Sequence, residues 1–75
     1  MVRFIKIDSS HNMARFYNIY FWPTLFGDVA VVREWGRLGG GSQRRSNWFS
    51  TEAEALAALE RASQRREQRG YQRVE

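Results

Sequence analysis

The sequence predicts an α+β fold, in which a small antiparallel β-sheet of about four to five strands is covered on one face by one long C-terminal helix. Up to residue 49, short stretches of alternating polar and apolar residues are separated by turn-forming residues. From residue 53 to 69, the chain contains no Gly, no Pro and no β-branched residue. The length of 75 residues fits a single domain, residues 1–75, with a thin hydrophobic core.

The first two strands are predicted at residues 2–8 and 15–22, on either side of a polar turn at residues 9–12. In the second strand, both faces carry aromatic side chains. This pattern indicates a central strand, or a strand with one face on the helix and the other on a ligand or partner. Pro23 is expected to end the strand, because Pro has no N–H to donate to a sheet.

A hairpin follows, with strands predicted at residues 29–35 and 43–49 after a loop at residues 24–28. Gly36 and the three glycines at residues 39–41 break the alternating pattern and favour a bulge or turn. Trp35 is therefore expected near the end of its strand, on the same face as Arg33.

The helix is predicted to begin at Thr51, which with Glu54 three residues later forms a capping box. Gly70 suits the position just after the last helical turn. Beyond it, Val74 is a candidate for a short edge strand. The apolar residues expected to face the sheet follow helical spacing and form a narrow, Ala-rich stripe: Ala55, Leu56, Ala58, Leu59 and Ala62.

The composition favours binding over catalysis. The net charge is +4, the isoelectric point is near 10.3, and eleven of the twelve cationic side chains are Arg. An Arg-rich surface with many aromatic rings favours nucleic acid as partner, with an acidic protein second and simple solubility as the alternative. There is no Cys, His11 is the single His, and no Walker-type phosphate loop is present. We therefore expect no enzymatic activity, no cofactor and no metal site.

The hairpin at residues 34–45 holds most of the candidate binding residues. A Trp suits stacking, arginines suit phosphate, and glycines allow close approach of the backbone to a ligand. The alternative is an ordinary turn whose Trp packs in the core and whose arginines are solvated. The predicted nucleic-acid-binding residues are Trp35, Gly36, Arg37, Gln43, Arg44 and Arg45, with Arg33 and Lys6 adding to the same patch.

These residues resemble the WGR domain family, which is named for a Trp-Gly-Arg motif. The resemblance runs from about residue 4 to 71. Its residues, in order, are Asn12, Phe16-Tyr17, Val31-Val32, Trp35-Gly36-Arg37-Leu38-Gly39, Gln43, Phe49 and Gly70-Tyr71. The sequence departs from the usual pattern at Ser42, where the family often has Gly, and at Tyr20, where many members have Gln.

The resemblance implies a non-catalytic α+β module. In DNA-dependent poly(ADP-ribose) polymerases the domain contacts a DNA end or break, where the Trp stacks on a terminal sugar, basic groups meet phosphate, and the Arg relays contact to neighbouring domains. Bacterial genomes also encode stand-alone WGR domains. By this resemblance Trp35 would stack and Arg37 would contact phosphate or relay. A protein-interaction module that docks through Arg37 and exposed aromatics such as Trp22 or Trp48 is the alternative.

The sequence also predicts the cellular location and the oligomeric state of the protein. No segment approaches the roughly 20 apolar residues that span a bilayer, and the first ten residues do not resemble a signal peptide. We expect a cytoplasmic protein, associated with the nucleoid if it binds DNA. A monomer is expected, although free strand edges in a small sheet would permit a dimer.

Overall fold

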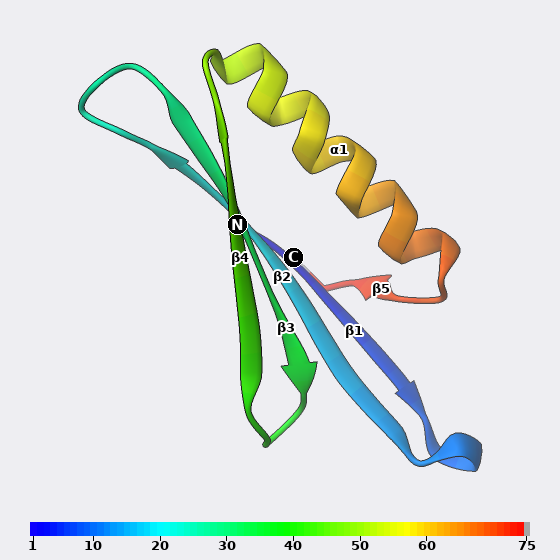
Figure 1. Ribbon diagram of the computed structural model, residues 1–75. Helices are drawn as coiled ribbons and strands as arrows, with labels where there is room; N and C mark the ends of the chain where they lie inside the picture. The colour runs from blue at the N-terminus through cyan, green and yellow to red at the C-terminus, as the bar shows by residue number, and fades with distance from the viewer. Residues whose placement is uncertain (75) are drawn as a thin grey trace.

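In the residues that the structure describes, one antiparallel sheet is packed against one α-helix, as predicted. The computed structural model describes residues 1–74. The strands follow the order β4-β3-β2-β1-β5, and α1 lies along one side of the sheet (Figure 1). The elements are β1 (Val2–Asp8), the short 3-10 helix η1 (Ser9–His11), β2 (Met13–Pro23), β3 (Val29–Arg37), β4 (Ser42–Phe49), α1 (Glu52–Gln68) and β5 (Gln72–Arg73).

The aromatic strand β2 lies in the middle of the sheet, which confirms its predicted central position. It begins two residues earlier than expected, because Met13 pairs with Asp8 as soon as the chain leaves η1. It includes Pro23 as its last residue, opposite Val29 of β3. Its residues therefore alternate between the face under α1 and the uncovered face.

β3 continues through Gly36 and Arg37, so the prediction that Gly36 breaks the strand is wrong. Gly36 pairs with Phe16 on one side and Ser42 on the other. A Cβ at Gly36 would collide with the carbonyl oxygen of Gly41 and lie 3.1 Å from the Cα of Ser42. Gly is required here because two backbones approach closely within the hairpin, not because the chain turns.

Both ends of α1 have the predicted caps. The Thr51 hydroxyl accepts a hydrogen bond from the backbone N–H of Glu54 at 3.2 Å and donates one to the Glu54 carboxylate at 3.0 Å. Gly70 follows the helix with φ of +90°, a conformation that suits Gly. The chain then returns along β1 as β5, one residue before the expected position, and the N–H of Val74 donates to the carbonyl of Arg3 at 2.9 Å.

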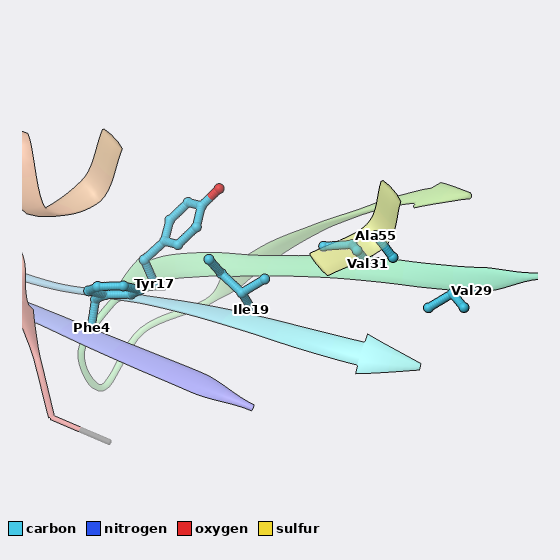
Figure 2. Close-up of a cluster of buried hydrophobic side chains, with 6 residues drawn as sticks. All are labelled: Phe4, Tyr17, Ile19, Val29, Val31 and Ala55. Atoms are coloured by element: carbon cyan, nitrogen blue, oxygen red, sulfur yellow. The ribbon is translucent and has the colours of Figure 1, made fainter. Parts of the chain in front are cut away.

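The core lies between α1 and the sheet (Figure 2). Its buried side chains come from β1, β2, β3 and α1: Phe4, Tyr17, Ile19, Val29, Val31 and Ala55. The prediction that Leu56 faces the sheet is wrong, since this side chain is 49% exposed. Ser63 is buried instead, and its hydroxyl donates to the carbonyl of Leu59 at 2.9 Å. A small Ser in this position suits the close approach of a helix to a thin core.

Candidate nucleic-acid interface

Strand pairing brings several predicted residues together on the face of the sheet under α1. Tyr17 of β2, Trp35 of β3 and Gln43 of β4 lie opposite one another in a single row across three strands. In the next row, Arg33 of β3 lies opposite Arg45 of β4. Residues in one such row and its neighbour on the same face are close enough for their side chains to interact.

The Trp35 ring belongs to a layered stack. It lies nearly parallel to the Tyr17 ring, with centroids 5.9 Å apart and an interplanar angle of 20°. The guanidinium of Arg66, from α1, lies 4.4 Å from the centroid of the Tyr17 ring, within the range of a cation–π interaction. Trp35 is half-buried against the core. The stack therefore holds the indole in a fixed orientation at the edge of the core.

A cavity of about 470 Å³ opens beside this stack. Its lining combines two aromatic rings, an amide and five arginines, without any carboxylate: Tyr17, Arg33, Trp35, Gln43, Arg44, Arg45, Arg66 and Arg69. Arginine side chains offer planar sets of donors that match phosphate oxygens. The cavity therefore offers an anion several donors beside a flat ring.

Arg44 is the one cavity arginine with an ion pair within residues 1–74. Its side chain starts from the opposite face of β4, where its guanidinium lies 3.0 Å from the carboxylate of Glu34. The hydrogen bond from Arg44 holds the pKa of Glu34 below its ordinary value. The Tyr20 hydroxyl also donates to Glu34, at 3.4 Å. Arg44 therefore stands at the rim of the cavity with its charge partly balanced.

The family model described as "WGR domain" matches residues 1–75. The chain belongs to the WGR family. It is also 36% identical, over 66 residues, to the uncharacterized protein y4dW of Sinorhizobium fredii (strain NBRC 101917 / NGR234). That match covers 88% of this chain and 32% of the relative, so the chain spans about a third of the length of the curated relative that it matches. No solved structure matches the chain. WGR domains are non-catalytic modules of a nucleic-acid-binding type.

The three residues of the WGR motif lie in different surroundings in this domain. Trp35 lines the cavity, whereas Gly36 keeps the β3–β4 hairpin closed. Arg37 points toward the β1–β2 connection, where its guanidinium donates to the carbonyl of Asn12 at 3.2 Å. Arg37 is exposed and does not line the cavity. Arg37 is therefore placed to contact a binding partner at this end of the sheet.

Lys6, which was predicted in the same basic patch, lies elsewhere in the WGR domain. Its ammonium donates to the carbonyl of Arg69 at 2.6 Å, at the C-terminal end of α1. It also lies 5.8 Å from the centroid of the Tyr71 ring. The structure thus brings five of the eight predicted residues to one cavity, namely Arg33, Trp35, Gln43, Arg44 and Arg45, and places Lys6, Gly36 and Arg37 outside its lining.

Three cavity residues were not among the predicted binding residues: Tyr17, Arg66 and Arg69. The two arginines continue the spacing of the apolar stripe, since Ala62, Arg66 and Arg69 follow at intervals of four and three. This spacing was visible in the sequence. It predicts that the last turns of α1 direct basic side chains toward the sheet.

Metal binding and membrane spanning find no support in the part of the chain that the structure describes. His11 contacts the Asp8 carboxylate at 2.8 Å on an exposed turn, and no group of three or more potential ligand side chains among residues 1–74 could hold a metal ion. In the same residues, no helix is long and apolar enough to cross a bilayer.

Proposed function

We propose that this WGR domain binds nucleic acid without catalysing a reaction and recognises DNA ends or breaks at the arginine cavity. The observation that carries the proposal is the set of five arginines around a half-buried, stacked Trp35, with no carboxylate in the lining. Phosphate would be attracted by this charge, while the ring offers a flat surface for a sugar or a base.

Stacking on Trp35 requires a sugar or base with one free face, and this requirement favours DNA ends. Inside a duplex, both faces of every base are stacked on neighbours, and freeing one costs a few kcal/mol. At an end or a nick, a terminal sugar or base already has an open face. A Trp fixed by Tyr17 and Arg66 can stack there without any cost of unstacking. Arg33 and Arg45, one row along the sheet, would then contact the adjoining phosphates.

The stacking role is tested by replacing the indole. We expect Trp35→Ala and Trp35→Leu to weaken binding to a blunt linear duplex by about 1–3 kcal/mol, the range for one stacked base. Binding to a closed circular duplex should change less. Because Trp35 packs against the core, both variants are measured below their melting temperatures, with circular dichroism to verify folding. An equal loss on linear and circular DNA would refute stacking on an end.

The phosphate contacts are tested by the salt dependence of binding. Each lost phosphate contact lowers the slope of log K against log salt concentration by about 0.9 on duplex DNA. We expect this decrease for Arg45→Ala, which removes a cavity arginine. Arg61→Ala removes the same charge from the exposed surface of α1, outside this cavity, and serves as the matched control. Equal slopes for both variants would remove Arg45 from the interface.

A protein-interaction module is the second candidate, and exposed apolar side chains favour it. Leu25 and Phe26 are 99% and 94% exposed in the loop between β2 and β3, at the end of the sheet away from Trp35. Trp and Arg side chains are frequent at the centres of protein interfaces. Failure to bind any nucleic acid at low salt, together with specific capture of one protein that requires Arg37 or these side chains, would favour this function.

A further inference from the structure

The face of the sheet turned away from α1 carries two exposed tryptophans, Trp22 and Trp48, which are 64% and 62% exposed. They come from β2 and β4 and lie on either side of Ala30 in β3, in one row across the sheet. Because adjacent strands are about 4.8 Å apart, the two tryptophan backbones are about 10 Å apart. Ala30 between them is only 3% exposed, so the side chains around it shield it from solvent.

This row forms one end of a second cavity, of about 400 Å³. Its lining is mostly apolar, with a few polar groups: Tyr20, Trp22, Ala30, Val32, Arg44, Ser46 and Trp48. Contact distances of about 3.5–4.0 Å on each face mean that one flat ring needs walls about 7–8 Å apart. Two indole side chains rooted about 10 Å apart can reach that separation over the floor of Ala30. Ser46 and Tyr20 add two hydroxyl groups to the lining, and the Tyr20 hydroxyl donates to Glu34.

The second cavity and the arginine cavity lie on opposite faces of the sheet and share one lining residue. Arg44 lines both of them, since its side chain lies on the exposed edge strand β4. Along β4, Arg44 and Trp48 are four residues apart, about 13–14 Å. Among the strand residues of this face, Glu34 is the one carboxylate, and it is paired with Arg44. A polynucleotide strand could therefore pass from the arginines to the tryptophans without meeting an unpaired negative charge.

We propose that Trp22 and Trp48 form a second binding site, which stacks an unpaired base of a single-stranded segment. The proposal rests on the proposed function, since the strand would leave a DNA end held at Trp35 and pass Arg44 over the β4 edge. It adds to that function a preference for ends that carry a single-stranded overhang. An apolar peptide would use the same rings but would gain nothing from Arg44, which connects the two cavities.

The test compares a labelled blunt duplex with the same duplex carrying a short single-stranded overhang of thymines, in both strand polarities. We expect the wild-type domain to bind the better overhang about 10-fold more tightly, within the range for one stacked base. Trp48→Ala and Trp22→Ala should abolish this difference and leave the blunt-end affinity unchanged. Ala30→Leu, which fills the floor, should do the same. Phe26→Ala removes an exposed ring outside the cavity and should behave as wild type.

The blunt duplex separates the two proposals. Blunt-end binding without any gain from an overhang would overturn the second site and leave the proposed function standing, whereas absence of binding to every DNA would overturn both. Equal loss on blunt and overhang DNA in Trp48→Ala would also overturn the second site. The second site would also be overturned if Trp48→Ala lowered the sedimentation coefficient of the free protein relative to the wild type, because this face would then bind a second copy of the chain.

Discussion

Replacing Gly36 by Ala should disrupt the β3–β4 hairpin, and the reason lies in backbone contacts. The added methyl group would collide with the carbonyl oxygen of Gly41 and lie 3.1 Å from the Cα of Ser42 and 3.3 Å from the carbonyl carbon of Gly41. All three atoms belong to the backbone of the opposite arm, so no side chain can rotate out of the way. The arm from Gly41 to Ser42 must therefore move as a whole.

The size of the effect follows from the cost of overpacking, about 1–3 kcal/mol. In a domain of this length, 1 kcal/mol changes the melting temperature by roughly 4–8 °C. We therefore expect the collision alone to lower the melting temperature of Gly36→Ala by about 4–24 °C. The lower entropy of the unfolded chain with Ala works in the opposite direction, by about 0.4–1 kcal/mol.

Gly41→Ala is the matched control, because a Cβ at Gly41 would meet nothing within 4 Å. It should melt at or slightly above the wild-type temperature, and it measures the effect of Ala on the unfolded chain alone. Thermal melts followed by circular dichroism give the difference between the two variants. If Gly36→Ala melts with Gly41→Ala, the close approach of the two arms does not explain the Gly of the motif.

Three further predictions concern the caps of α1 and the ion pair. Thr51→Ala should lower the free energy of unfolding by about 0.5–2 kcal/mol in urea titrations, and a loss below this range would mean that the cap is not formed in solution. Glu34→Gln removes a carboxylate whose pKa is lowered by Arg44. The stabilisation by this carboxylate should be complete at neutral pH and disappear as the pH falls through the lowered pKa. The pairing would be contradicted if variant and wild type differed in melting temperature by the same amount at neutral pH and below the lowered pKa. Lys6→Met should cost about 1 kcal/mol through its bond to the Arg69 carbonyl without changing the salt dependence of DNA binding, and a lower salt slope would place Lys6 at the interface after all.

The sequence predicted the elements well because each depends on local patterns. Alternation located four strands, and the pair Thr51 and Glu54 located the start of α1. The error at Gly36 arose because Gly in a strand has two meanings, a break in the chain or a close approach of backbones, and only the register opposite Ser42 decides between them. The error at Leu56 arose because an Ala-rich helix offers two overlapping stripes of small residues.

The candidate site was predictable only in part, since its residues come from separate elements. Trp35 and Arg45 are close in sequence and were found through the hairpin. Tyr17 and Arg66 reach the same cavity through the pairing of β2 with β3 and the docking of α1 on the sheet. Neither the register nor the docking angle follows from local propensity. Conversely, Lys6 was assigned to the patch because of its charge, and the fold directs it to the end of α1.

The most direct test of the central claim is a competition experiment at low and moderate salt, followed by fluorescence anisotropy. The wild-type domain is bound to a labelled blunt duplex, and unlabelled DNA of one sequence is added either as a linear duplex or as a closed circle. We predict that the linear form competes better at equal base-pair concentration and that binding weakens steeply with salt. Equal competition by linear and circular DNA would contradict recognition of ends, and absence of binding at low salt would contradict nucleic-acid binding itself.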